Sequence, residues 1–114
     1  MAQQYIDRAT FDELKKVSGE EFIGELVDTF LEDAPKIMSE LKSALKKGEA
    51  DAFRRAAHSL KSNGATFGAG HFAELARELE MIGKEGRLAD TGDKIQTLEA
   101  NFKLVAEELK GLRA

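Results

Sequence analysis

Apolar residues recur every three or four positions through most of the chain, which is the spacing that places side chains on one face of an α-helix. The first such stretch covers residues 10–17. Thr10 opens it and Glu13 follows three residues later, a capping-box pattern that predicts a helix start. We therefore expect a short helix here, ended by the pair Ser18-Gly19.

The next stretch, residues 20–47, is the longest, and it contains Pro35, the single proline of the chain. Apolar positions keep the same helical phase before and after the proline. Two interpretations fit this pattern: one long helix bent at the proline, or two helices that meet near Asp33-Ala34. We favour the single bent helix because the apolar stripe does not shift its phase.

Three further amphipathic stretches follow. We expect helices over about residues 49–66 and 70–85, and a last helix within 88–112 that begins near residues 90–93. The last stretch alternates apolar spacings of three and four, at Ile95, Leu98, Phe102, Val105, Leu109 and Leu112. Such a heptad-like seam also suits self-association, but core packing is the simpler interpretation. Four long amphipathic segments with short connections predict an all-α fold, an antiparallel up-down four-helix bundle with a short additional N-terminal helix.

Bulk composition narrows the class of protein. A length of 114 residues suits one domain, which we place at residues 1–114. The net charge of −4 argues against a general nucleic-acid binder. No apolar run approaches the roughly 20 residues that cross a bilayer, the N-terminus does not have the pattern of a signal peptide, and cysteine is absent. We therefore expect a cytoplasmic monomer that binds neither membrane nor nucleic acid.

His58 has the most distinctive surroundings of any residue in the chain. On a helical wheel it lies about 140° from the apolar stripe of its helix, because each residue turns by about 100°. That stripe consists of Phe53, Ala57, Leu60, Gly64 and Phe67. The imidazole therefore faces water, and the residues one or two turns away are basic or small: Arg54, Arg55, Lys61, Ser62 and Ala65.

This setting suits a histidine that carries a phosphoryl group. A neutral ring nitrogen is a nucleophile, and part of an exposed histidine is neutral near pH 7. Lys61 can pair with phosphoryl oxygens, and Arg54 and Arg55 can pair with those oxygens or with an acidic partner. The small Ser62 and Ala65 leave room for the active site of another protein. The alternative is an ordinary surface histidine on a solvated basic helix face.

Other kinds of site fit the sequence less well. His71 lies at the start of the fourth expected helix and has Glu74, not a lysine, three residues later, so we expect a surface residue. The two histidines are thirteen residues apart and lack the spacing of a His-Glu-x-x-His zinc motif. We therefore expect no metal site, and no nucleotide-binding motif is present.

The segment around His58 resembles a known signature. Ala57-His58-Ser59-Leu60-Lys61-Ser62 is followed by Gly64-Ala65, Phe67-Gly68-Ala69 and Leu79-Glu80, and this series is similar to that of histidine phosphotransfer (HPt) domains. The resemblance extends to residues 30–35 and 47–51, which match the family's second helix and the turn before its active helix. It covers nearly the whole chain, with the final helix matching only in type.

The resemblance implies a role for each matching residue. His58 is then the phosphorylated residue, on the ring nitrogen farther from the backbone, and Lys61 stabilises the phosphoryl group. Gly68 lets the neighbouring helix and turn pack closely beneath the site. Glu80 occupies the position that hydrogen-bonds the other ring nitrogen and fixes the tautomer, although a solvated surface carboxylate is the alternative. Ser62 departs from the family, which usually has glycine here, and adds a hydroxyl near the phosphoryl group.

The function implied by this resemblance is that of a histidine-containing phosphotransfer protein in a multistep two-component phosphorelay. His58 would accept a phosphoryl group from an aspartate of a response-regulator receiver domain and pass it to another receiver, or back. The partners are receivers and a hybrid histidine kinase, and the protein is a carrier, not an enzyme, with no cofactor of its own because the receiver supplies Mg²⁺. Two alternatives stay open: a docking or scaffold module that carries no phosphate, and a sink that drains one regulator.

Overall fold

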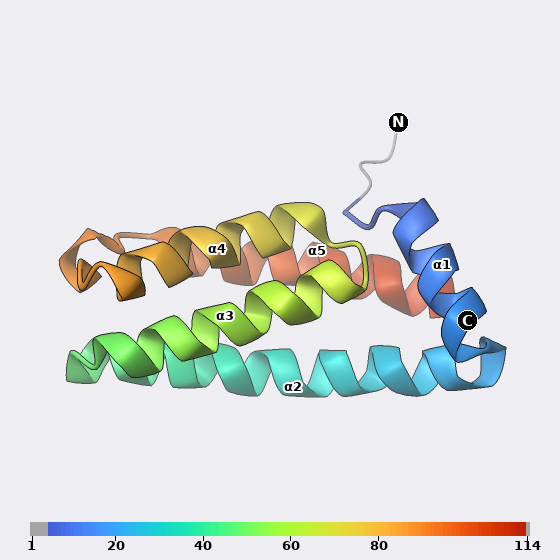
Figure 1. Cartoon of the computed structure of the whole chain (residues 1–114), viewed down its shortest axis with the longest axis horizontal. Coiled ribbons are helices and arrows are strands. Elements are labelled where there is room, and N and C mark those ends of the chain that lie inside the picture. The colour runs from blue at the N-terminus through green and yellow to red at the C-terminus, as the bar shows by residue number, and fades with distance from the viewer. Residues whose placement is uncertain (1–4, 114) are drawn as a thin grey trace.

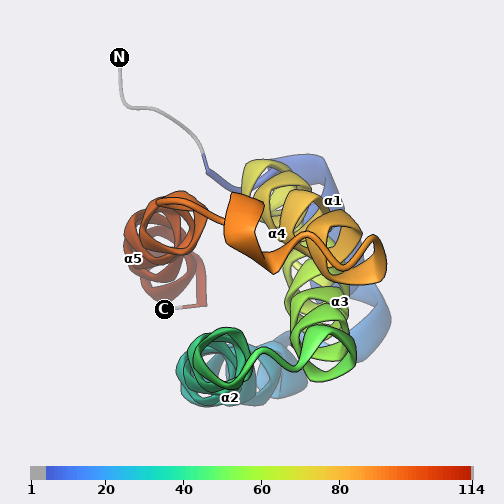
Figure 2. The ribbon, with the colours of Figure 1, turned by 90° about the vertical axis from the view of Figure 1, so that its left-hand side faces the viewer.

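Helices make up all the regular structure of the described part of the chain (Figure 1). This computed structural model describes residues 5–113. The helices are α1 (Arg8–Ser18), α2 (Glu20–Lys47), α3 (Ala50–Thr66), α4 (Gly70–Lys84) and α5 (Lys94–Arg113), with a 3-10 turn at Leu88–Asp90 before α5. Figure 2 shows α2, α3, α4 and α5 around a common interior, while α1 lies across one end of the bundle. The predicted antiparallel four-helix bundle with a short N-terminal helix is confirmed. Within residues 5–113, no helix is both long and apolar enough to cross a membrane.

The start of α1 differs from the prediction. The helix begins at Arg8, and the carboxylate of Asp7 caps it by accepting hydrogen bonds from the Thr10 backbone N–H at 3.2 Å and the Thr10 hydroxyl at 2.5 Å. The expectation that Thr10 itself is the cap was wrong. Aspartate is at least as good a helix cap as threonine, and starting at Asp7 makes Thr10 the third residue of the helix, whose N–H needs an acceptor.

The long helix α2 passes through Pro35 without a break. Seven side chains on its inner face are buried, on both sides of the proline: Ile23, Val27, Phe30, Ala34, Met38, Leu41 and Ala44. This continuous burial stabilises the helix where the proline lacks a backbone N–H. The prediction of a single helix over residues 20–47 is confirmed, and α2 extends along the length of the bundle (Figure 1).

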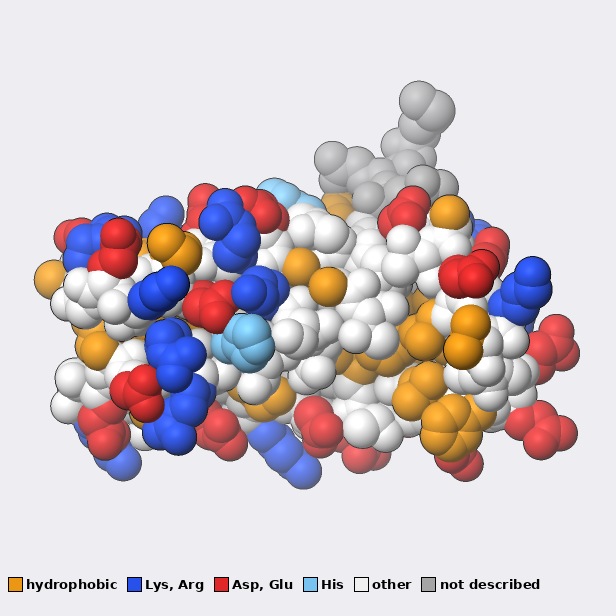
Figure 3. All heavy atoms as spheres, in the orientation of Figure 1, with side chains coloured by type: hydrophobic (Ala, Val, Ile, Leu, Met, Phe, Trp, Pro, Cys, Tyr) orange, Lys and Arg blue, Asp and Glu red, His pale blue; other side chains and the backbone are white. Residues whose placement is uncertain are grey.

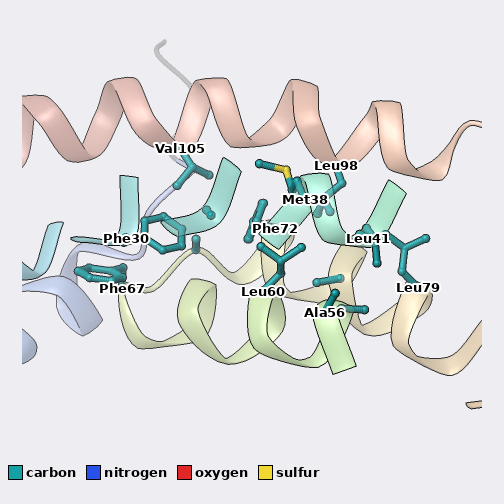
Figure 4. Close-up of a cluster of buried hydrophobic side chains, with 14 of the residues drawn as sticks. Phe30, Met38, Leu41, Ala56, Leu60, Phe67, Phe72, Leu79, Leu98 and Val105 are labelled. Carbon is teal, nitrogen blue, oxygen red and sulfur yellow. The ribbon is translucent and has the colours of Figure 1, made fainter. Parts of the chain in front are cut away.

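Side chains from all five α-helices meet in one hydrophobic core, part of which is shown in Figure 4. Four phenylalanines lie together in it, with ring centroids of neighbouring pairs 5.1–6.2 Å apart: Phe30, Phe67, Phe72 and Phe102. In α3 every residue of the predicted apolar stripe is buried, whereas His58 is exposed. The core therefore fixes the rotation of α3 and holds His58 on the outside of the bundle.

The inner face of α5 departs from its predicted stripe. Ile95, Leu98, Val105 and Leu109 are buried as expected, but Phe102 and Leu112 are only half-buried. Asn101 is buried instead, with 7% of its surface exposed. A pattern of apolar residues does not find such a position, because asparagine is usually a surface residue.

Asn101 gives a prediction for stability. Its side-chain Oδ1 is buried and has no hydrogen-bond partner among the described residues, and an unsatisfied buried acceptor costs about 1–3 kcal/mol. We expect Asn101→Leu, a side chain of similar branched shape, to raise the free energy of unfolding by about 1 kcal/mol in urea titrations. As a control, Leu98→Ala on the same helix should lower it by about 2–5 kcal/mol. A loss of stability in Asn101→Leu would contradict this account of the buried amide.

Candidate functional site

Two glycines let α3 and α4 approach each other closely on either side of His58. A Cβ atom at Gly64 would lie 2.6 Å from the ring of Phe72, and a Cβ atom at Gly83 would lie 2.9 Å from the backbone nitrogen of Arg54. A larger residue at either position would require the ring of Phe72 or the backbone at Arg54 to move. This close packing brings the outer faces of α3 and α4 together into one surface (Figure 3).

The side chains of His58 and Glu80 meet across this helix pair. His58 is about half exposed, at 54%, and its Nδ1 lies 2.7 Å from Oε2 of Glu80. The other carboxylate oxygen, Oε1, lies 2.7 Å from Nζ of Lys61. One carboxylate from α4 therefore binds two side chains from α3, and the contact between Glu80 and His58 expected from the family resemblance is present.

This contact determines which ring nitrogen of His58 is available. An ionised carboxylate only accepts hydrogen bonds, so Nδ1 must be the protonated donor. In the neutral ring the lone pair then belongs to Nε2, the nitrogen farther from the backbone.

The environment of Glu80 keeps its carboxyl group ionised. Burial raises the pKa of Glu80, whose side chain is 15% exposed, but hydrogen bonds from Lys61 and His58 and the charges of both residues lower it by more. The resulting pKa lies below the ordinary glutamate value. Glu80 is therefore an acceptor at neutral pH, as the pairing with His58 and Lys61 requires.

The two arginines near His58 are less free than the sequence analysis assumed. Nη2 of Arg54 lies 3.0 Å from Oδ1 of Asp51, and Nε of Arg55 lies 3.2 Å from Oδ2 of the same residue. Asp51 lies toward the start of α3, so it draws both guanidinium groups away from the turn that carries His58. The ion pairs of Asp51 were not predicted from the sequence, although its spacing of three and four residues from the arginines is that of ion pairs along a helix.

Charged side chains also gather unevenly on this surface. Figure 3 shows them mostly over the half where α3 begins and α4 ends, whereas the half toward the α3–α4 turn is largely uncharged. Ser62 and Ala65, the two small residues expected beside His58, are both exposed. On its uncharged side, the surface next to His58 therefore carries short side chains and is accessible to a large partner.

Gly68 lies in the turn between α3 and α4. Gly68 has a φ of +83°, and a Cβ atom there would lie 2.8 Å from the backbone oxygen of Asp7. It therefore packs closely against the start of α1, at the far end of α3, and not beneath His58 as expected. Gly64 and Gly83 make the close approach beside the site.

His71 is an exposed residue in the first turn of α4. Within residues 5–113, no three side chains of the kind that bind metal ions come together.

Comparison with known proteins agrees with this geometry. The Hpt domain family matches residues 25–114. Phosphorelay protein LuxU of Vibrio cholerae is 30% identical over 94 residues, which are 82% of this chain and 83% of LuxU. The crystal structure of histidine-containing phosphotransfer protein B (HptB) from Pseudomonas aeruginosa PAO1 superposes with a TM-score of 0.90 at 30% identity, covering 98% of this chain and 96% of HptB.

Fold and sequence together define a helical phosphotransfer protein. The chain belongs to the Hpt domain family and is a histidine phosphotransfer protein of a phosphorelay. Proteins of this class are carriers of phosphoryl groups that exchange them with receiver domains.

The bonds of Glu80 predict a specific pH dependence of stability. Because its pKa is lower in the folded chain, ionised Glu80 stabilises the fold above its unfolded pKa of about 4.3, and this contribution is lost as the pH falls through the folded pKa. We expect Glu80→Gln to lower the free energy of unfolding at neutral pH and to have a smaller effect near about pH 3, as measured by urea unfolding.

The matched control is Glu78→Gln on the same helix. Glu78 is exposed and makes none of the hydrogen bonds or ion pairs found among the described residues. We expect no pH-dependent difference from wild type for this variant. An equal effect of Glu80→Gln at both pH values would contradict the stabilising role of the ionised carboxylate.

Proposed function

We propose that His58 is the residue that carries the phosphoryl group, accepting it from the aspartate of a receiver domain and passing it to a second receiver or back. The observation that supports this most directly is the contact between His58 Nδ1 and Glu80, because it leaves the lone pair on Nε2 of a half-exposed ring. A solvent-facing neutral nitrogen is what attack on an aspartyl phosphate of another protein requires.

The transfer step balances without any further reactant. The Nε2 lone pair forms a bond to phosphorus while the bond between phosphorus and the aspartate oxygen breaks, and the receiver recovers its carboxylate. The proton stays on Nδ1, so the phosphorylated ring carries a positive charge next to the Glu80 carboxylate. Glu80 thus stabilises the charge that develops during transfer, and the reverse step follows the same path.

Lys61 has a second role in this proposal. In the structure its ammonium group is bound to Glu80 at 2.7 Å, and its side chain is 31% exposed. Once a phosphoryl group is on Nε2, its oxygens offer a stronger negative charge one helical turn from Lys61. We infer that Lys61 pairs with these oxygens and neutralises charge during transfer.

The surface around His58 fits a receiver as the partner. Ser62 and Ala65 keep the surface low on one side, while Arg54 and Arg55 offer cations to an acidic pocket on the other. Their pairing with Asp51 weakens this attraction, which should also fade as salt concentration rises. The proposal includes Mg²⁺ supplied by the receiver, a hybrid histidine kinase upstream, and a monomeric, non-enzymatic carrier in the cytoplasm.

The direct test is phosphorylation by a receiver. Incubation with a phosphorylated receiver domain and Mg²⁺ should give an acid-labile phosphoryl adduct on the wild-type protein, detected by intact mass. His58→Gln should reduce this adduct to background while changing the free energy of unfolding by less than about 1 kcal/mol, because an exposed side chain contributes little to stability. His71→Gln, which alters the other histidine, should be labelled like wild type.

Full labelling of His58→Gln would overturn the site assignment. If receivers bind the wild-type protein but leave it unlabelled, it is a docking module, not a carrier.

Lys61 gives a second prediction. Lys61→Ala should slow transfer from the receiver about tenfold or more, because a charged donor to the phosphoryl oxygens is lost. Rapid-quench measurement of the transfer rate at saturating receiver separates this effect from weaker docking. Lys84→Ala, which removes an exposed lysine that makes no ion pair among the described residues, should transfer at the wild-type rate. A normal rate in Lys61→Ala would exclude a role in transfer.

A further inference from the structure

One hydrogen-bond donor next to His58 has no partner among residues 5–113. Four residues of α3 lie one helical turn from His58, and all four carry a donor: Arg54, Arg55, Lys61 and Ser62. The two arginines are paired with Asp51 and the lysine is paired with Glu80. The exposed hydroxyl of Ser62 makes none of the hydrogen bonds found within residues 5–113.

Helix geometry places Ser62 on the same face of α3 as His58. Side chains of an α-helix lean toward its N-terminus, so Ser62 leans back over the turn that carries His58. Residues four apart on a helix have Cβ atoms about 5–6 Å from each other. A phosphoryl group bonded to Nε2 of His58 adds three oxygens on the solvent side of the ring, about one helical turn from Ser62.

The charged side chains near His58 lie on other sides of the ring than the Ser62 hydroxyl. Lys61 approaches from the side of α4, where Glu80 lies, and Arg54 and Arg55 are held toward the start of α3 by Asp51. Phosphoryl oxygens on the side of the α3 C-terminus therefore face Ser62 or water. Serine is small enough to contribute its hydroxyl without closing the surface to a docking receiver.

We propose that Ser62 Oγ donates a hydrogen bond to a phosphoryl oxygen on His58 and thereby shifts the transfer equilibrium toward the phosphorylated form of this protein. The inference rests on the proposed function, since it assumes that His58 carries the group. The hydroxyl keeps its proton, and no bond to serine forms or breaks. Ser62 therefore binds the phosphoryl group, and it determines how strongly this chain retains the group relative to its receiver.

Phosphoryl transfer to the serine itself would need a base to remove the hydroxyl proton. Among the described residues neither a carboxylate nor an imidazole is hydrogen-bonded to the Ser62 hydroxyl, and the backbone oxygen of Ser62 accepts a hydrogen bond from the hydroxyl of Thr66 at 3.0 Å. The arrangement therefore suits a donor and not a nucleophile.

The test measures the equilibrium constant of phosphoryl exchange with a receiver. The full-length protein is phosphorylated with phosphoramidate, a small-molecule donor, and is then mixed with receiver and Mg²⁺ until the distribution of label is constant. Ser62→Ala should shift the equilibrium toward the receiver by about threefold, which corresponds to one exposed hydrogen bond. Ser62→Thr keeps the hydroxyl and should stay near the wild-type value. Because the constant refers to free, undocked species, altered docking does not change it.

Ser59→Ala is the matched control, since Ser59 is another exposed serine of α3 that lies about 100° around the helix from His58. It should leave the equilibrium unchanged. The phosphorus NMR shift of the phosphorylated protein, recorded without receiver, should change in Ser62→Ala and not in Ser59→Ala.

Three results would contradict these proposals, and the experiment distinguishes them. Equal equilibrium constants for wild type and Ser62→Ala, with His58 labelled in both, would overturn the role of Ser62 alone. An acid-stable label that disappears in Ser62→Ala would show that the serine accepts the phosphoryl group, which also overturns it. A wild-type protein that phosphoramidate and receivers both leave unlabelled on His58 would overturn the proposed function itself.

Discussion

The carboxylate of Glu80, bonded at 2.7 Å to both His58 and Lys61, is the interaction on which the site depends. It sets the tautomer of the imidazole and holds the lysine beside it. It stays ionised because hydrogen bonds from Lys61 and His58 lower its pKa by more than burial raises it. These contacts join α3 and α4, which pack closely against each other. Gly64 and Gly83 allow that approach. The packing of α3 against α4 thus helps to determine which ring nitrogen of His58 is available to react.

The basic side chains around His58 form ion pairs with carboxylates of the same chain. Asp51 binds both arginines, and Glu80 binds the lysine. In the unphosphorylated protein these pairs limit the repulsion among the cations and hold their side chains in place. An incoming phosphoryl group or an acidic partner competes for the same cations, so binding exchanges existing ion pairs for new ones. Exposed exchanges of this kind involve small free-energy differences, which suits a carrier that must also release what it accepts.

Comparison of particular helices shows where sequence patterns are informative. The apolar stripe of α3 is long and regular, and every one of its predicted positions is buried, so the outward direction of His58 followed from periodicity alone. At α1 two residues were equally able to cap the helix, and the pattern selected Thr10 where the structure uses Asp7. At α5 the buried Asn101 broke the apolar pattern. Errors therefore fell where several residues satisfy the same local rule, or where burial contradicts residue type.

The sequence by itself determined the helices, their inner faces and the exposure of His58, because each depends on residues a few positions apart. It also contained the ion pairs of Asp51 with Arg54 and Arg55, which lie within one turn of a single helix. Only the tertiary structure decided the contact between His58 and Glu80, which are 22 residues apart on different helices. That contact depends on the distance and relative rotation of α3 and α4, which are set by side chains throughout the core and by the two glycines between the helices.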